Sequence, residues 1–87
     1  METISREPTT VGVILLEEFI KPLNIKYDEL GAFLNVSPSH IENIILGNRR
    51  LSKGNAIKLA LFFKTDIDFW INIQINHDAW EYKFKKG

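Results

Sequence analysis

Residues 27–46 read YDELGAFLNVSPSHIENIIL, and this stretch decides the fold of the chain. Counted from Tyr27, a glycine stands at position five, an asparagine stands at position nine, and the positions that face inward are apolar: Leu30, Leu34, Val36, Ile41 and Ile44. This is the spacing of a helix-turn-helix, in which two short helices cross at a steep angle. The sequence predicts that motif here. An ordinary short helical hairpin has apolar residues at similar spacing and stays open as the alternative.

Three residues give this spacing its physical meaning. The two helices are expected to touch at Gly31, where a side chain larger than that of alanine would push them apart. The turn needs a positive φ at Asn35, and asparagine is the residue after glycine that adopts it most readily. Val36 follows directly and is expected to fill the apolar space beneath the turn.

The rest of the chain is predicted to be helical too, because its apolar residues recur at intervals of three and four and nowhere alternate with polar ones. Pro22 is expected to end the first helix, and Ser37, Ser52 and Asp66 are expected to cap the last three. The expected helices are residues 11 to about 21, about 26–34, 38–46, about 53–64 and about 67–84. We expect one all-α domain of five helices over residues 11–84, with an N-terminal arm at residues 1–10 and a tail at residues 85–87.

The composition is that of a globular domain, with 45% apolar and 25% charged residues in a chain of 87. The chain has no cysteine, which excludes disulfides and thiolate zinc sites. The apolar runs, such as residues 13–16 and 59–63, are far short of the roughly 20 residues that cross a membrane, and the first residues lack the pattern of a secretory signal. We therefore expect a cytoplasmic protein.

The charges are balanced overall but unevenly distributed. Eleven basic and eleven acidic residues cancel, which by itself argues against a strongly electropositive nucleic-acid binder. Residues 1–42, however, carry seven acids against three bases, whereas residues 43–64 hold five bases and no acid: Arg49, Arg50, Lys53, Lys58 and Lys64. One local surface of a neutral protein is therefore expected to be positive, next to the predicted helix-turn-helix.

The second helix of such a motif lies in the major groove of DNA with its first residues toward the base edges. The candidate base-reading residues are Ser37, Ser39, His40 and Asn43. Asn43 is the strongest of them, because an asparagine can bond an adenine through two hydrogen bonds. A purely capping role for Ser37 and a solvent-exposed role for His40 are the alternatives.

The turn after this helix carries side chains that suit phosphates. The candidate phosphate-binding residues are Asn48, Arg49, Arg50 and Lys53. Contacts to the DNA backbone hold a reading helix in register, and each neutralised phosphate makes the affinity more dependent on salt. Two arginines in a loop are also common as solubilising residues, and only the neighbouring motif favours the phosphate-binding role.

An apolar and aromatic stripe runs down the last predicted helix. Its members lie at helical spacing: Ile73, His77, Trp80 and Phe84. A core of this size cannot easily cover the whole stripe, so we expect it to contact a second copy across a two-fold axis. Sealing of the monomer core is the alternative.

The sequence argues against an enzyme. Its two histidines, His40 and His77, lie in different helices, and the chain has neither a cysteine nucleophile nor a glycine-rich phosphate loop. His77 and Glu81 could share a metal, but two ligands are fewer than a stable zinc site requires. We expect no cofactor and no metal.

Four stretches together resemble the HigA-type antitoxins of the XRE helix-turn-helix group. They are GVILLEEFIKPL from Gly12, the region through Gly47-Asn-Arg-Arg50, AIKLALFFKT from Ala56, and FWINIQ at residues 69–74. The box formed by Phe69, Trp70, Asn72 and Gln74 is the most distinctive part. A structural role is favoured over a direct functional one for it, with the aromatic residues packed in the core and Asn72 or Gln74 bonding exposed helix ends. The family usually has alanine at the position of Gly31 and glycine at the position of Asn35.

The resemblance implies a five-helix, lambda-repressor-like domain that binds operator DNA as a homodimer and represses its own operon. It also implies that the protein is the antitoxin of a type II toxin-antitoxin system, neutralising a HigB-type, RelE-like toxin that cleaves mRNA on the ribosome. Two other functions stay open. One is a stand-alone phage-type repressor without a toxin, and the other is a protein-interaction module with the same fold and no DNA binding.

Overall fold

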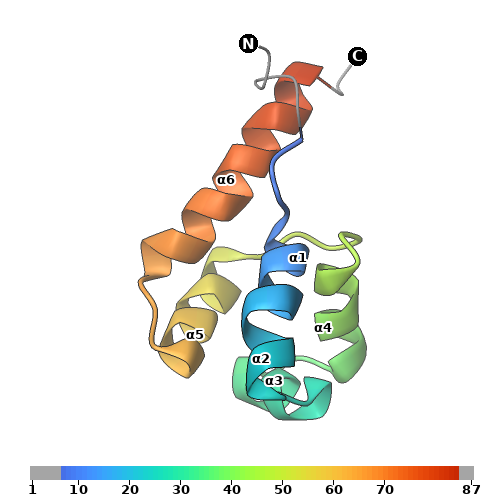
Figure 1. Ribbon diagram of the computed structural model, residues 1–87, viewed down its shortest axis with the longest axis vertical. Coiled ribbons are helices and arrows are strands. Elements are labelled where there is room, and N and C mark those ends of the chain that lie inside the picture. The colour runs from blue at the N-terminus through green and yellow to red at the C-terminus, as the bar shows by residue number, and fades with distance from the viewer. Residues whose placement is uncertain (1–6, 85–87) are drawn as a thin grey trace.

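The computed structural model describes residues 7–84, and the regular structure within this range is entirely helical. Residues 11–23 form one unbroken helical segment made of α1 (Val11–Ile14), η2 (Leu15–Ile20) and α2 (Lys21–Leu23). The helices α3 (Tyr27–Leu34), α4 (Pro38–Ile45), α5 (Lys53–Phe63) and α6 (Ile67–Phe84) follow it (Figure 1). The predicted all-α fold of five helices is confirmed for this part of the chain.

The ends of the chain are described only in part. Residues 1–6 of the predicted arm and residues 85–87 of the predicted tail lie outside the described residues. Residues 7–10 precede α1 without forming a helix, and the Thr10 hydroxyl accepts a hydrogen bond from the Val13 N–H at 3.1 Å. No helix in the described range is long and apolar enough to cross a membrane.

Pro22 does not end the first helix, contrary to the sequence prediction. The helix continues through Leu23 and stops at Asn24, which has a left-handed φ of 55°. The turn before the proline is a wide π-type turn, in which the Lys21 N–H donates to the Leu16 carbonyl five residues back. In a regular α-helix the proline ring collides with the carbonyl four residues back, and the wide turn relieves that collision.

The caps at Ser37 and Ser52 follow the sequence prediction, whereas at α6 only the Asp66 backbone carbonyl accepts a hydrogen bond, from the Phe69 N–H at 3.2 Å. The hydroxyls of Ser37 and Ser52 accept hydrogen bonds from the N–H groups of His40 and Asn55, both at 3.1 Å. Asn35 ends α3 with a φ of 62°, as the spacing predicts. Lys64 ends α5 in the same left-handed conformation, with a φ of 60°, although no local signal in the sequence indicated it.

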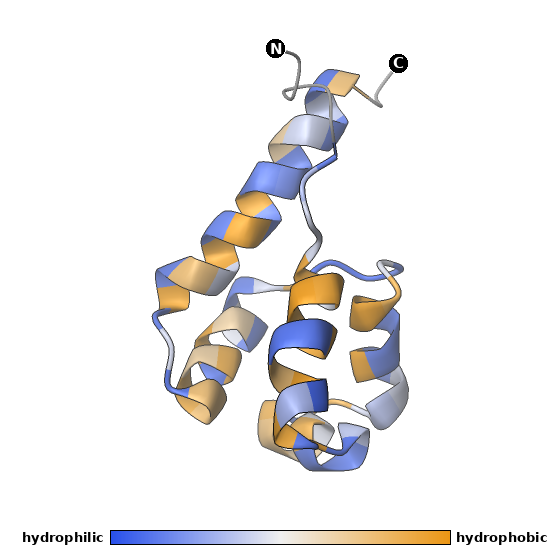
Figure 2. Cartoon of the chain, in the orientation of Figure 1, coloured by the Kyte–Doolittle hydropathy of each residue, from blue (hydrophilic) through white to orange (hydrophobic). Residues whose placement is uncertain are grey.

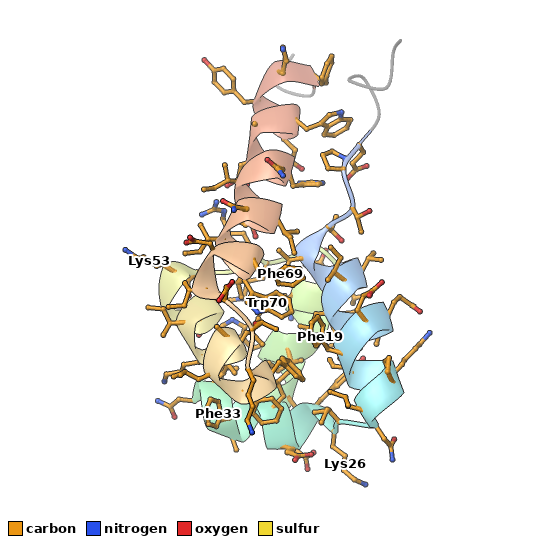
Figure 3. The ribbon with its side chains drawn as sticks, turned by 60° about the vertical axis from the view of Figure 1, so that its left-hand side comes forward. Phe19, Lys26, Phe33, Lys53, Phe69 and Trp70 are labelled. Carbon is orange, nitrogen blue, oxygen red and sulfur yellow. The ribbon has the colours of Figure 1, made fainter. Side chains whose placement is uncertain are left out.

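Trp70 lies at the centre of the core and is completely buried. Its ring centroid lies 5.0 Å from those of both Phe19 and Phe69, so the first helix and the start of α6 meet through aromatic rings (Figure 3). The indole N–H donates to the Thr65 hydroxyl at 2.7 Å, which satisfies the one polar atom of the buried side chain. The packing of Trp70 therefore fixes α6 to the body of the protein.

Two glycines allow backbones to approach closely. A Cβ added at Gly31 would lie 2.7 Å from the Val36 carbonyl oxygen, so even an alanine here would force the turn of the helix-turn-helix to shift. The sequence predicted the close approach but allowed alanine. A Cβ added at Gly12 would lie 2.5 Å from the Ile44 carbonyl oxygen and would also overlap that of Ile45. Gly12 is therefore the point where α1 crosses the end of α4.

The second half of α6 extends beyond the rest of the molecule. Figure 1 shows α6 rising away from the other helices, with the segment before α1 running beside it. Most of this projecting part is hydrophilic or intermediate, with a hydrophobic position at its last turn (Figure 2). Apolar side chains are therefore carried on a helix that the other helices do not enclose.

Candidate nucleic-acid interface

The N-terminal end of α4 is uncovered. Ser37, Pro38 and Ser39 are exposed, whereas Ile41 and Ile44 on the inner face of the same helix are buried. Figure 1 shows α3 running across the bottom of the view while α4 rises at its side, so the two helices cross rather than lie parallel. The structure thus has the two features on which the helix-turn-helix prediction depends, which are crossed helices and an accessible tip.

The C-terminal end of α4 is closed by a Schellman motif, in which backbone groups of the turn satisfy the last carbonyls of the helix. Gly47 has a φ of 82°, its N–H donates to the Ile44 carbonyl at 3.1 Å, and the Asn48 N–H donates to the Asn43 carbonyl at 2.9 Å. The Asn48 side-chain amide also donates to Asn43 Oδ1 at 3.3 Å. Asn43 is half-buried, and this contact orients its side chain while its own amide N–H groups remain available.

His40 is half-buried on α4, near Arg49 of the following loop. Burial, and secondarily the positive charge of Arg49, lowers the pKa of His40 below its ordinary value of 6.5. The imidazole is therefore neutral at neutral pH and has one nitrogen that donates and one that accepts. Arg49 therefore acts electrostatically on a residue of α4.

The two predicted phosphate-binding arginines have different surroundings. Within residues 7–84, Arg49 makes no ion pair, whereas Arg50 Nη2 pairs with the Asp78 carboxylate of α6. Lys53 is exposed at the first position of α5 and projects away from the helix (Figure 3). Arg50 is therefore directed toward α6, whereas Arg49 follows Asn48, whose side chain bonds Asn43 of α4.

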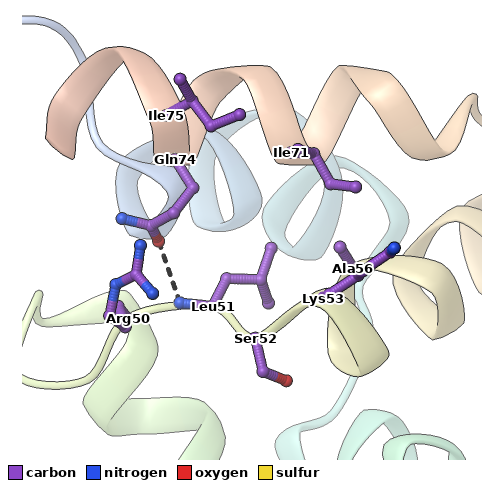
Figure 4. Close-up of a pocket in the computed structure, with 8 residues that line it drawn as sticks. All are labelled: Arg50, Leu51, Ser52, Lys53, Ala56, Ile71, Gln74 and Ile75. Carbon is purple, nitrogen blue, oxygen red and sulfur yellow. Dashed lines mark hydrogen bonds between the residues drawn. The ribbon is translucent and has the colours of Figure 1, made fainter. Parts of the chain in front are cut away.

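A groove lies between α6 and the loop that follows α4. It has a volume of about 320 Å³, and its walls include Arg50, Leu51 and Gln74 (Figure 4). Gln74 points from α6 toward the loop, and its Oε1 accepts a hydrogen bond from the Leu51 N–H at 2.9 Å. The sequence singled out Gln74 only as a residue that could bond a helix end, and it gave no signal for Asp78.

The predicted dimer stripe of α6 divides into two parts. Ile73 packs against the core, and His77 Nε2 lies 2.6 Å from Glu7 Oε2 in the segment before α1. Trp80 stands between the rings of His77 and Phe84, with centroids 5.9 Å away on each side. The first half of the stripe therefore contacts its own chain, and the second half lies on the projecting part of α6.

His77 and Glu81, which the sequence argues against as a metal site, are in loose contact, because Nδ1 of the histidine lies 3.8 Å from the Glu81 carboxylate. Glu7 approaches the same ring from the other side. Among the described residues there is no group of three or more histidine, cysteine or acidic side chains that could hold a metal ion.

Comparison with known proteins places this geometry among helix-turn-helix proteins. Residues 16–70 match the family model HTH_3, described as helix-turn-helix. The HTH-type transcriptional regulator YbaQ of Escherichia coli K12 is 42% identical over 93% of this chain and 72% of its own length. Antitoxin HigA-1 of Vibrio cholerae is 35% identical over 93% of this chain and 76% of its own length.

A solved structure extends the comparison to a complex with DNA. The structure of the Pseudomonas aeruginosa antitoxin HigA with the higBA promoter has a TM-score of 0.78 to this chain and 32% sequence identity. The match covers 84% of this chain and 79% of the other. The fold of the described residues is therefore one that another protein uses in complex with a promoter.

Proposed function

Because this chain belongs to the HTH_3 helix-turn-helix family, we propose that it is an operator-binding repressor of its own operon and the antitoxin of a type II toxin-antitoxin system. At the coarser level it is a DNA-binding regulator related to the HigA antitoxins, from a family that is not one of enzymes. The observation that carries the proposal is the uncovered N-terminal end of α4, near Arg49, which makes no ion pair within residues 7–84.

In the proposed complex α4 enters the major groove with its exposed end toward the bases. Ser39, His40 and Asn43 lie within reach of base edges, and Ser37 adds its hydroxyl while its other role is to cap the helix. Asn43 has the greatest capacity for discrimination, because its oriented amide can bond an adenine through both its nitrogen and its oxygen. Asn48, Arg49, Arg50 and Lys53 are the proposed contacts to phosphates.

The DNA-binding proposal predicts two different kinds of loss. Asn43→Ala should remove about 1–3 kcal/mol of preference for the operator over a scrambled duplex, because it removes a base contact. Arg49→Ala should weaken binding to both duplexes alike and reduce the slope of log affinity against log salt by about 0.9, because it removes a phosphate contact. Fluorescence anisotropy with the DNA upstream of the gene, measured at several salt concentrations, distinguishes the two.

Lys21→Gln is the control for this experiment, since it removes one positive charge from the first helix, where Lys21 pairs with Glu17. It should leave the salt slope unchanged. An equal loss on operator and scrambled DNA for Asn43→Ala would mean that Asn43 reads no base. Absence of any shift by the wild-type protein at low salt would instead favour the protein-interaction module without DNA binding.

The proposed dimer uses the projecting half of α6, where Trp80 and Phe84 carry the predicted stripe outward. We expect Trp80→Asp to convert the dimer to a monomer in analytical ultracentrifugation, because it places a charge in an apolar contact. Tyr82→Asp is the matched control, since Tyr82 is an exposed aromatic residue on the opposite face of the same helix. A monomer from Tyr82→Asp together with an intact dimer from Trp80→Asp would place the contact on that opposite face.

A two-fold dimer further implies DNA half-sites about one helical turn, roughly 34 Å, apart. The antitoxin part of the proposal is supported by the names of the relatives, which include HigA antitoxins. It is tested by expressing the reading frame adjacent to the gene, with and without this protein, while growth and mRNA cleavage are followed. A protein that binds its operator but neither copurifies with that product nor restores growth is a stand-alone repressor.

A further inference from the structure

Asp78 of α6 forms an ion pair with Arg50 in the absence of DNA. Arg50 Nη2 donates to Asp78 Oδ2, although the two residues are 28 positions apart in the chain. The other carboxylate oxygen, Oδ1, accepts a hydrogen bond from Gln74 Nε2 at 2.9 Å. Gln74 in turn accepts from the Leu51 N–H at 2.9 Å (Figure 4), so the carboxylate is held in position against the loop.

This contact changes what Arg50 gains from DNA. An arginine that meets a phosphate from water gains a charge-assisted hydrogen bond and releases counterions from the DNA. An arginine that is already paired with a carboxylate must break that ion pair to bind a phosphate, so its net gain in free energy is smaller. The carboxylate that it leaves also remains close to the phosphate and repels it. Arg50 should therefore gain less from a phosphate than Arg49, which has no acidic partner within residues 7–84.

We propose that Asp78 is an internal competitor of DNA phosphate for Arg50, and that α6 limits the affinity of the protein for DNA through this contact. The inference rests on the DNA binding proposed above. Its geometric basis is the network in which Gln74 orients the Asp78 carboxylate and also fixes the backbone next to Arg50. Since the side chain of Arg50 is 65% exposed, it can leave the carboxylate without opening the core.

Asp78→Asn tests this directly, because asparagine keeps an oxygen that accepts from Gln74 but offers Arg50 no negative charge. We expect the variant to bind the upstream duplex roughly two- to fivefold more tightly per protomer, which is the size expected for the loss of an exposed ion pair. The slope of log affinity against log salt should steepen by up to about 0.9 per protomer, because Arg50 then neutralises a phosphate. Anisotropy titrations of a labelled duplex over a range of salt measure both quantities.

Two further variants separate this effect from a general change of charge. Glu81→Gln removes a carboxylate one turn further along α6. The gain in DNA affinity that it gives measures the effect of losing one negative charge without changing the contact of Arg50. When Asp78→Asn is combined with Arg50→Ala, the gain in DNA affinity that it gives should be no larger than the gain given by Glu81→Gln. Arg50→Ala should also cost less than Arg49→Ala in the wild-type protein, and its cost should rise when Asp78→Asn is present.

The possible outcomes are distinct. Unchanged affinity and salt slope for Asp78→Asn, with normal DNA binding by the wild-type protein, overturn the competitor proposal alone. Weaker binding by Asp78→Asn also overturns it and makes Asp78 a residue that positions the loop for DNA. A wild-type protein that binds no duplex even at low salt overturns the proposed function together with this inference. A gain that persists fully in the Arg50→Ala background assigns it to net charge and likewise overturns the proposal.

Discussion

Replacement of Trp70 by alanine is expected to lower the free energy of unfolding by about 3–5 kcal/mol. Trp70 is completely buried, and its ring packs against Phe19 and Phe69 from two different helices. The substitution removes the largest buried side chain and leaves a cavity where α6 meets the body. Because domains of this size have only about 5–15 kcal/mol of stability, this loss is a large fraction of the total.

Thermal and urea unfolding followed by circular dichroism measure this effect, with a shift of the midpoint of roughly 4–8 °C for each kcal/mol. Leu61→Ala is the control, because Leu61 on α5 is 65% exposed and its loss should change stability by no more than about 0.5 kcal/mol. Trp70→Phe should lower the free energy of unfolding by an amount between those of Leu61→Ala and Trp70→Ala, since it keeps a ring but loses the hydrogen bond to Thr65. A loss below about 1 kcal/mol for Trp70→Ala would contradict its place in the core.

Gly12→Ala is expected to destabilise the protein by about 3 kcal/mol, although alanine favours helices over glycine by about 1 kcal/mol. The reason is the crossing of α1 and α4. A Cβ at this position would overlap the Ile45 carbonyl oxygen and lie 2.5 Å from that of Ile44. These atoms belong to the backbone at the end of α4, so the overlap is relieved only if α1 and α4 move apart. DNA affinity should therefore fall along with stability.

Gly54→Ala is the matched control for this substitution. Gly54 lies in the first turn of α5, and a Cβ there would meet nothing within 4 Å. The same change should therefore stabilise the protein by up to about 1 kcal/mol, through helix propensity alone. Urea unfolding of both variants gives the comparison. Stabilisation by both substitutions would show that α1 and α4 do not approach each other at Gly12.

The predicted helices and caps agree with the structure wherever neighbouring residues decide the outcome. Ser37, Asn35 and Ser52 act on groups within three or four positions of themselves, and all three occupy the predicted ends of helices. Pro22 was the exception, because a wide turn formed by the preceding residues accommodates its ring. No apolar pattern indicates such a turn, since it differs from an α-helix only in hydrogen-bond register.

The candidate site was predictable as a set of residues but not as an arrangement. The sequence named Ser39, His40 and Asn43 as candidates on one helix; in the structure Ser39 is exposed, and His40 and Asn43 are half-buried. The adjacent arginines were indistinguishable in the sequence, whereas Arg50 pairs with Asp78 and Arg49 lies beside His40. Likewise, the stripe of α6 gave no sign that Glu7 would contact His77.

The amino-acid sequence alone determined five helices, the helix ends at Asn35, Ser37 and Ser52, and the helix-turn-helix, because hydrophobic periodicity and capping act between residues a few positions apart. Only the tertiary structure decided that Gly12 marks the crossing of α1 and α4, and that Asp78 of α6 forms an ion pair with Arg50 but not with Arg49. These features depend on pairs of residues about 30 positions apart in the chain. Their proximity is set by how whole helices pack around Trp70, which no local pattern specifies.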